Sequence, residues 1–251
     1  MAATVSCLQF APVKGLALHA PPTLDLVAGG VAGDRRFVIV TAEGRALYGA
    51  DLAALAGAAS DHADGVLELR FADGEVIDAP IATGEAVHGR AYADRPVPGR
   101  LVIGPFGAAL SERLGRPVRL IEVEPGRGTP GPLTVIADSS VARVAEEVGV
   151  TALDPRRFRM NVALAGLDAH AEDAWDGREV RIGAAVVRIQ GQVPRCVLTT
   201  RDPDTARRDH DVLRAILAYR MPMAGGEAPL GMYGYVVQPG RVYLGDAVEP
   251  T

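Results

Sequence analysis

Hydrophobic and polar residues alternate in many short runs along this chain of 251 residues. A period of two is typical of strands that bury one face, and short unbroken apolar runs are typical of strands buried on both faces. Frequent glycine and proline (29 and 18 residues) separate the runs and favour many short elements. The pattern predicts strands at residues 5–10, 24–27, 37–40, 66–71, 118–123, 133–137, 161–164, 179–182, 186–189, 233–237 and 241–244.

Helical spacing is confined to a few segments. It predicts helices at residues 51–59, 107–114, 139–148 and after Asp211. Strands follow strands more often than they alternate with helices. The pattern therefore predicts mixed sheets or barrels with helices packed outside, and not a doubly wound parallel sheet.

Three further segments affect the predicted organisation. We place no element between residues 80 and 100, where small and polar residues mix. Pro239 and Gly240 predict the turn of a final hairpin between residues 233–237 and 241–244. The Gly- and Pro-rich residues 125–132 are the best candidate for a domain junction.

Composition narrows the class of protein. A chain with 48% hydrophobic and 23% charged residues is an ordinary globular protein, and its net charge of -5 argues against a general nucleic-acid-binding protein. Cys7 and Cys196 lie far apart, so we expect no disulfide framework and a reducing compartment. The sequence lacks a run long enough to span a bilayer and a signal-peptide pattern. We therefore expect a cytoplasmic protein that binds neither membranes nor nucleic acid.

Several common chemistries are missing from the sequence. It contains neither the phosphate-binding Gly-x-x-x-x-Gly-Lys motif nor a dinucleotide Gly-x-Gly-x-x-Gly motif in a strand–helix context, and no Gly-x-Ser-x-Gly elbow. The histidines lack the spacing of a helical zinc site. Lys14 is the only lysine and lies in a loop beside a proline, which is either a functional signal or a consequence of the arginine-rich composition.

The segment around Cys196 is the most informative part of the chain. Arg195 precedes the cysteine, a short apolar run follows it, and Asp202 to Asp204 closes the segment as a turn. We interpret the segment as a strand with Cys196 near its beginning. The adjacent guanidinium would favour a thiolate, which suits a soft or borderline metal. The alternative is a strand cysteine that packs as a small hydrophobic residue.

Several segments, taken in chain order, resemble the motifs of one family. They are residues 10–15 (Phe-Ala-Pro-Val-Lys-Gly), 33–37 (Gly-Asp-Arg-Arg-Phe), 157–161 (Arg-Phe-Arg-Met-Asn), 171–175 (Ala-Glu-Asp-Ala-Trp), 195–205 (Arg-Cys-Val-Leu-Thr-Thr-Arg-Asp-Pro-Asp-Thr) and 240–246 (Gly-Arg-Val-Tyr-Leu-Gly-Asp). The chain thereby resembles the MOSC proteins, which bind molybdenum cofactor. It is similar to the amidoxime-reducing molybdenum enzymes and to the C-terminal part of molybdenum-cofactor sulfurases.

The resemblance implies a fold and a cofactor site. The expected fold is α+β and mainly β, with an N-terminal β-rich domain at residues 1–124 and a MOSC-type β-barrel with peripheral helices at residues 125–251. Molybdenum bound to molybdopterin would lie between the domains, with Cys196 as the metal ligand and the catalytic cysteine. The resemblance implies that the cofactor-binding residues, besides Cys196, are Lys14, Gly15, Arg35, Arg159, Asn161 and Arg195.

Some of these roles stay open. Arginine and lysine suit the pterin phosphate, because they offer a planar fork of donors and a point charge. Arg195 either supports the anionic sulfurs of the cofactor or pairs with an acid of the fold. Asp202 is expected to hold the turn, and Phe158 and Trp175 are expected to be core residues.

The sequence departs from the family pattern at three positions. Gly15 replaces a serine, Met160 replaces a proline, and Pro194 stands where a small polar residue is common. These changes affect the outer contacts of the cofactor more than the metal ligand itself.

The predicted function is a molybdenum-dependent oxidoreductase. It would reduce N-oxygenated small molecules, such as amidoximes, hydroxylamines or N-hydroxylated bases. The chain has no cysteine cluster for an iron–sulfur domain, so electrons are expected from a separate protein of the iron–sulfur, flavin or haem type. The alternative is a cofactor carrier or a sulfur-delivery module with a persulfide on Cys196. A third possibility is a family member that has lost the cofactor.

Overall fold

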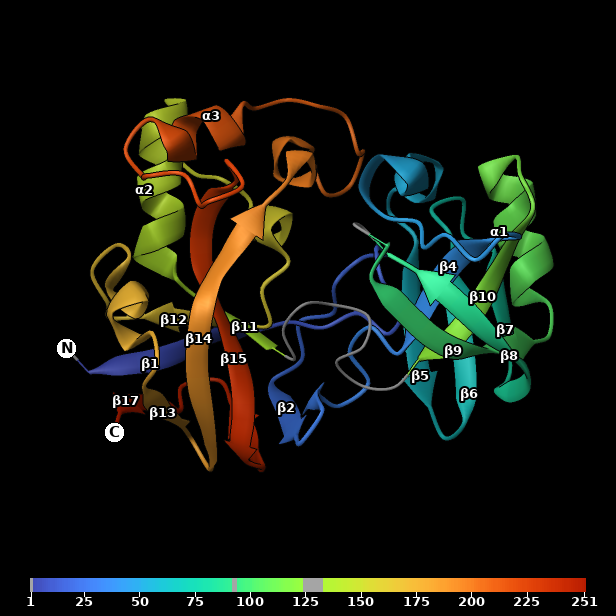
Figure 1. Ribbon diagram of the computed structural model, residues 1–251, viewed down its shortest axis with the longest axis horizontal. Coiled ribbons are helices and arrows are strands. Elements are labelled where there is room, and N and C mark those ends of the chain that lie inside the picture. The colour runs from blue at the N-terminus through green and yellow to red at the C-terminus, as the bar shows by residue number, and fades with distance from the viewer. Residues whose placement is uncertain (1, 92–93, 124–132) are drawn as a thin grey trace.

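The computed structural model describes residues 2–91, 94–123 and 133–251 of the protein. Two β-rich halves lie side by side (Figure 1). One half is a closed barrel with helices on its outside, and the other is built from open sheets. The mainly β fold with peripheral helices is therefore as predicted. No helix in the described ranges is both long and apolar enough to cross a membrane.

The barrel carries both ends of the chain. In spatial order its strands are β1 (Ala3–Leu8), β12 (Val162–Ala165), β11 (Leu133–Ala137), β15 (Ala228–Gln238), β14 (Ala185–Arg195), β13 (Glu179–Ile182) and β17 (Ala247–Pro250). β11 and β12 pair in parallel, whereas β14 and β15 form a long antiparallel pair. Inward-facing residues such as Val180 and Ile182 of β13 are fully buried, as their alternation predicts.

Strand β11 is buried on both faces. Leu133 belongs to the barrel core, while Ile136 packs outward against Val144 of α2 (Asp138–Val148). An unbroken apolar run is what such a doubly covered strand requires. The other helical segments on this half are the 3-10 helices η3 (Pro155–Phe158), η4 (Ala171–Trp175) and η5 (Val197–Thr200) and the α-helix α3 (Val212–Leu217).

The second half encloses its own core. One sheet runs in the order β4 (Phe37–Thr41), β10 (Val118–Val123), β9 (Pro96–Ile103), β8 (Ala82–Arg90), and another runs β5 (Ala59–Ala63), β6 (Val66–Arg70), β7 (Val76–Pro80). The 3-10 helix η1 (Gly49–Leu55) and the helix α1 (Phe106–Leu114) pack on this core. Phe37 and Phe106 are fully buried in it.

The predicted final hairpin is wrong. β15 pairs on one edge with β14 and on the other with β11, so both of its edges are taken within the barrel. β16 (Gly240–Tyr243) therefore pairs with β2 (Thr23–Val27), which in turn pairs with β3 (Gly30–Val31). The Pro239 and Gly240 turn connects two different sheets.

Two strands were not predicted between residues 80 and 100. β8 and β9 form an antiparallel pair in which alternate positions are exposed, and glycines occupy places where the backbones lie close. A Cβ added at Gly99 would lie 2.5 Å from the carbonyl oxygen of Glu122. The requirement for glycine at such positions hides the hydrophobic pattern of the strand.

The predicted strand that begins near Cys196 is also wrong. β14 ends at Arg195, and Cys196 occupies the residue before η5. The hydroxyl groups of Thr199 and Thr200 donate to the carbonyl oxygens of Cys196 and Val197, three residues earlier, and so support this short helix. Cys196 thus lies just beyond the end of a barrel strand and not within one.

The proposed junction at residues 125–132 lies outside the described residues. The division into domains 1–124 and 125–251 stays a prediction. β1, from the start of the chain, pairs with β12 and β17 and is a strand of the barrel. The N-terminal segment therefore crosses from one half to the other before residue 37 begins β4.

Candidate functional site

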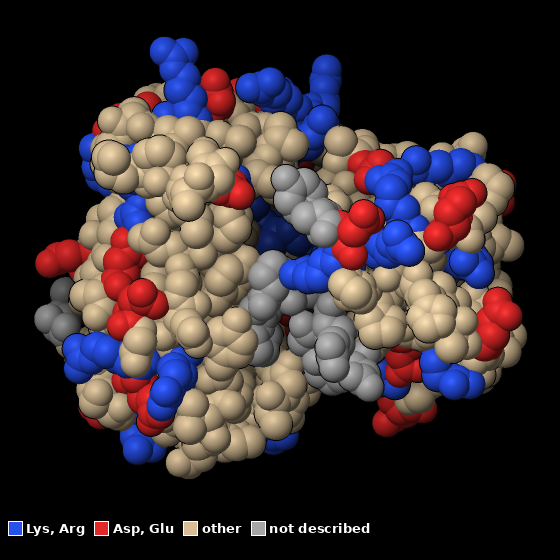
Figure 2. Space-filling model, viewed as in Figure 1, with Lys and Arg blue, Asp and Glu red and all other residues tan. Residues whose placement is uncertain are grey.

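The predicted site residues come from four connections between strands. Lys14 and Gly15 follow β1, Arg35 precedes β4, and Arg159 and Asn161 lie between η3 and β12. Arg195 ends β14, and Cys196 follows it. All of these segments meet where the two halves adjoin. Figure 2 shows Lys and Arg atoms lining a hollow in this region.

Cys196 is an exposed free thiol. Its backbone is extended, and its carbonyl oxygen accepts from the backbone amide of Thr199 at 3.1 Å. An exposed thiol at a fixed chain position is suited to ligate a soft metal or to react with a small molecule.

Arg195 lies buried directly behind the cysteine. Its Nε donates to the carbonyl oxygen of Leu230 and its Nη1 to that of Phe158, both at 2.8 Å, while Nη2 contacts the Met160 sulfur at 2.8 Å. Burial lowers its pKa to about 10. These bonds go to backbone carbonyls, and not to an acid as one alternative expected. Arg195 thereby joins β14, β15 and η3 behind Cys196.

Met160 occupies the place of the family's proline. Its thioether accepts from Arg195, and an added Cβ at Gly231 would lie 2.6 Å from its terminal methyl group. This departure is therefore part of the packing around Arg195. We have no structural account of the departure at Pro194.

Asp34 and Arg35 form the centre of the site. The Nη1 of Arg35 donates to Asp34 Oδ2 at 2.8 Å, and its Nη2 donates to the carbonyl oxygen of Arg159 at 3.0 Å. The side chain of Arg35 is 12% exposed and that of Asp34 is 4% exposed. Arg35 and Arg159 both have a φ of 51°, a left-handed conformation that non-glycine residues rarely adopt. Strained backbone of this kind is concentrated at functional sites.

Asn161 positions Asp34. Its Nδ2 donates to Asp34 Oδ2 at 3.0 Å and to the carbonyl oxygen of Gln9 at 3.1 Å. Its Oδ1 accepts from the backbone amide and the hydroxyl of Thr134 at 3.1 and 3.2 Å. An asparagine amide has two donors and two acceptor positions, and protein groups fill all of them here. Asn161 therefore acts on the site through Asp34 and Arg35.

Arg159 adds a second guanidinium. Its Nη2 donates to the carbonyl oxygen of Leu16 at 2.7 Å, which ties η3 to the loop after β1. Its pKa is lowered to about 10, first by burial and then by the charge of Arg35, although Asp34 opposes the shift.

Lys14 lies among these cations. Its Nζ is 5.5 Å from the centre of the Tyr48 ring. Its pKa is lowered to about 8 by burial and then by the charges of Arg35, Arg95 and Arg159. Burial is the larger cause of this shift, and the three guanidinium charges add to it, because nearby cations also disfavour a charged ammonium group.

Gly15 has a structural reason to be glycine. Its φ is 95°, and an added Cβ would collide with Cδ1 of Leu52 in η1. A serine, the residue that the family carries at this position, is disfavoured here by the left-handed φ, and its side chain would require that of Leu52 to shift. A crevice of about 70 Å³ nearby is lined by Gly15, Arg159 and Leu198, among others.

The sequence motifs did not indicate Arg95 and Tyr233. Arg95, just before β9, acts electrostatically on Lys14 and on Tyr233 of β15. The pKa of Tyr233 is raised by burial, although Arg195, Arg35 and Arg95 lower it. No local pattern marks either residue, because their proximity depends on how the two halves meet.

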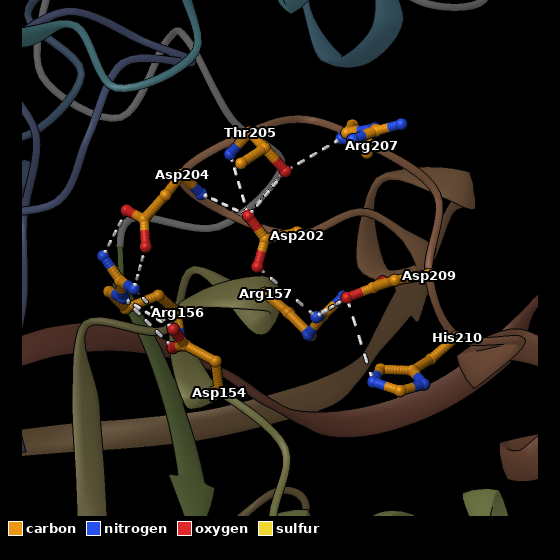
Figure 3. Close-up of polar contacts among 9 residues, drawn as sticks. All are labelled: Asp154, Arg156, Arg157, Asp202, Asp204, Thr205, Arg207, Asp209 and His210. Carbon is orange, nitrogen blue, oxygen red and sulfur yellow. Dashed lines mark hydrogen bonds and ion pairs between the residues drawn. The ribbon is translucent and has the colours of Figure 1, made fainter. Parts of the chain in front are cut away.

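A network of ion pairs fixes the segment after Cys196 (Figure 3). Arg156 donates to both carboxylate oxygens of Asp204 at 2.8 Å, and its neighbour Arg157 holds Asp209 through both Nη atoms. Asp202 accepts from the amide and the hydroxyl of Thr205, both at 2.8 Å, which confirms that it holds the turn.

Two expectations about the core are met. Phe158 and Trp175 are 2% and 5% exposed and are core residues, as predicted. The network binds the 201–209 segment to η3. The same element contains Phe158, whose carbonyl oxygen accepts a hydrogen bond from Arg195. The cysteine segment is thus anchored from both sides.

The donor set fits an anionic cofactor that brings its own metal ligands. The cations around Lys14 favour phosphate oxygens, and a single thiolate suits a metal whose other ligands come from a pterin. Among the described residues, no three His, Cys, Asp or Glu side chains converge on one point where they could hold a metal ion.

Comparison with known proteins gives a family match. Residues 125–249 match the family profile described as MOSC domain. Human mitochondrial amidoxime-reducing component 1 is 32% identical over 128 residues, a match that covers 47% of this chain and 36% of the human protein. Rat mitochondrial amidoxime reducing component 2 is 39% identical over 98 residues, covering 36% of this chain and 28% of the relative. The matches thus span about a third of the relatives' length.

A solved structure supports the fold. The YuaD protein from Bacillus subtilis superposes with a TM-score of 0.50 at 15% identity, covering 100% of this chain and 96% of that chain. At this identity the likeness concerns the fold alone.

Proposed function

This chain is a MOSC-domain protein, and from that premise we propose that it is a molybdenum-cofactor-dependent reductase of N-hydroxylated compounds. The relatives it matches are named as amidoxime-reducing components. The proposal includes the division into domains at residues 124 and 125, a cytoplasmic location and a separate electron-donor protein.

One observation carries the proposal. The pKa of Lys14 is lowered to about 8 first by burial and then by the charges of Arg35, Arg95 and Arg159, and Asp34 is the carboxylate that contacts Arg35 among them. Concentrating like charges in a partly buried place is unfavourable unless an anion neutralises them. A phosphate-bearing pterin with anionic sulfurs is such a ligand.

Each residue has a distinct role in the proposal. Lys14, Arg35 and Arg159 hold the pterin and its phosphate. Asn161 orients Arg35 through Asp34. The Cys196 thiolate ligates molybdenum, and Arg195 fixes the position of the cysteine from behind.

The reaction cleaves an N–O bond. An amidoxime takes up two electrons and two protons and gives an amidine and water. The bound cofactor would supply the oxygen-transfer and two-electron chemistry, while the protein supplies binding, orientation and charge. The electrons come from the separate donor protein, and solvent at the exposed Cys196 supplies the protons.

The test uses the two cysteines as a matched pair. Wild type, Cys196→Ser and Cys7→Ser are expressed in a host that makes the cofactor. Molybdenum content and reduction of benzamidoxime by a reduced viologen dye are then measured. Cys7 is a partly buried free cysteine on β1, distant in sequence from the cysteine motif.

We expect wild type and Cys7→Ser to contain molybdenum and to produce benzamidine, and Cys196→Ser to lose turnover by at least about 100-fold. Metal-free wild type, or full turnover by Cys196→Ser, contradicts the proposal. The exposed thiol also suits the alternative of a sulfur carrier. A sulfur adduct on Cys196 by mass spectrometry, without benzamidoxime turnover, would favour that alternative.

A further inference from the structure

An exposed surface of the barrel half lies directly beyond Cys196. It is formed by η5, the loop at residues 201–211 and α3. The loop folds back on the end of η5, because the amide of Asp209 donates to the carbonyl oxygen of Thr200 at 3.2 Å. α3 packs beside η5 in turn. These segments lie along one edge of the barrel half (Figure 1), and we call them the η5–α3 surface.

Apolar side chains are exposed on this surface. Val197, the residue after Cys196, is 47% exposed. Leu217 at the end of α3 is 40% exposed, and Met221 just beyond it is 85% exposed. Methionine is enriched in protein–protein interfaces, and exposed apolar residues that gather in one place are typical of a surface that another protein covers.

Arginines accompany these apolar residues. Arg207 and Arg214 are exposed, and neither forms an ion pair with any described residue. Arg208 is 63% exposed and lies 3.7 Å from Asp211, which is itself 53% exposed. Figure 3 shows the Arg207 side chain pointing away from the network of ion pairs, and Figure 2 shows Lys and Arg side chains projecting from this edge of the molecule.

The other acids of the loop do not offset these charges. Asp204 and Asp209 already accept hydrogen bonds from the guanidinium groups of η3. Arg207 and Arg214 are thus left without a carboxylate, although the whole chain carries a net charge of -5. A positive surface on an acidic protein favours a partner with negative charge at the contact.

We propose that the η5–α3 surface docks an acidic electron-carrier protein beside Cys196. This inference rests on the proposed reductase function. Carboxylates of the carrier face Arg207 and Arg214, and its apolar residues cover Val197 and Met221. Electron-transfer encounters bury less than about 1,200 Å², so a few arginines around an apolar group are enough for one. The carrier is oxidised by one electron in each encounter, and two encounters supply the two electrons of one turnover.

The test measures binding by calorimetry. Two acidic carriers, a plant-type ferredoxin and a flavodoxin, are titrated into the wild-type protein, with a basic c-type cytochrome as the carrier of opposite charge. We expect an acidic carrier to bind and the cytochrome not to bind. Arg207→Glu/Arg214→Glu should raise the Kd for the acidic carrier about tenfold, and Met221→Ser about threefold. Raising NaCl from about 0.1 to about 0.5 M should also weaken binding.

Arg178→Glu/Arg181→Glu is the matched control. Both arginines are exposed and form no ion pair within the described part of the chain. They lie at and just before β13, at the opposite end of the barrel half from α3 (Figure 1). The control should bind the carrier as wild type does. Equal weakening in the two double variants, or no binding of either acidic carrier, overturns the proposal. So does a wild-type dimer that Met221→Ser abolishes, because a second copy then covers the surface.

Turnover separates this inference from the proposed function. A reduced viologen dye is small and needs no docking surface. We therefore expect Arg207→Glu/Arg214→Glu to reduce benzamidoxime normally with viologen, but about tenfold more slowly with the acidic carrier at a concentration below its Kd. Equal carrier-supported rates in wild type and variant contradict the docking surface. Failure of wild type with viologen contradicts the proposed function instead, and the binding result still decides the docking surface.

Discussion

Replacing Arg157 by methionine tests whether burial determines how much the ion pairs that hold the cysteine segment contribute to the free energy of unfolding. Arg157 and Arg156 are neighbours in η3: Arg156 holds Asp204 of the 201–209 segment, while Arg157 holds Asp209 and also lies 3.9 Å from Asp202 (Figure 3). The side chain of Arg157 is 4% exposed and its partner Asp209 is 32% exposed. For Arg156 and Asp204 the values are 39% and 62%. Methionine keeps a long stem and removes the charge in both cases.

The expected magnitudes follow from these exposures. Breaking a fully buried pair is strongly destabilising because the remaining charge stays out of water, whereas exposed pairs contribute little. Asp209 is partly hydrated once Arg157 is gone, so we expect Arg157→Met to lower the free energy of unfolding by about 2 kcal/mol. Arg156→Met should lower it by about 0.5 kcal/mol.

Urea unfolding, followed by circular dichroism at pH 7, measures both free energies. In a thermal scan, a loss of about 2 kcal/mol corresponds to a lower Tm by about 4–8 °C for a chain of this size. If Arg156→Met destabilises the protein as much as Arg157→Met does, burial is not what distinguishes the two pairs, and the reasoning is refuted.

Three further predictions concern single residues of the site. The pKa of Asp209 is lowered, chiefly by its hydrogen bond with Arg157, so the pair contributes stability above the unfolded pKa of about 3.9 that is lost as pH falls through the folded value. In urea titrations, the difference in unfolding free energy between wild type and Arg157→Met should shrink as pH falls below the unfolded pKa and through the folded pKa of Asp209, and a constant difference across pH would contradict this assignment. Asn161→Leu removes the hydrogen bonds to Asp34 and Thr134 and should lower the unfolding free energy by about 3 kcal/mol or more, so a loss below about 1 kcal/mol would be inconsistent with a buried, fully bonded amide. Gly15→Ser, which restores the family residue, should destabilise by about 2 kcal/mol because of its left-handed φ and the collision with Leu52. In a double-mutant cycle with Leu52→Ala the two changes should couple favourably, and strict additivity would exclude the collision as the cause.

Local sequence patterns predicted the helices and strands that depend on neighbouring residues alone. The strand at residues 179–182 and the helix ending at Gly149 match the structure, because alternation and a left-handed C-cap glycine are properties of short segments. β16 pairs with β2 across more than 200 residues of sequence, Arg241 opposite Asp25. Nothing in either segment encodes that partner, and the nearer strand β15 is already paired on both edges.

In the candidate site, too, the sequence identifies individual residues but not the partners that they contact. The cysteine motif led to Cys196, and the structure leaves that thiol exposed. Asn161 and Arg195 also lie in motifs, but their hydrogen bonds go to protein groups that the sequence could not identify. Arg95 belongs to no motif, and its charge acts on Lys14 and Tyr233 only because of how the two halves of the fold meet.

The most direct test of the central claim is X-ray absorption spectroscopy at the molybdenum edge, on wild type and Cys196→Ser purified from a host that makes the cofactor. The account predicts molybdenum in wild type with sulfur neighbours, and one sulfur fewer in the variant. An unchanged sulfur shell in Cys196→Ser, or a wild-type protein without molybdenum, would contradict it.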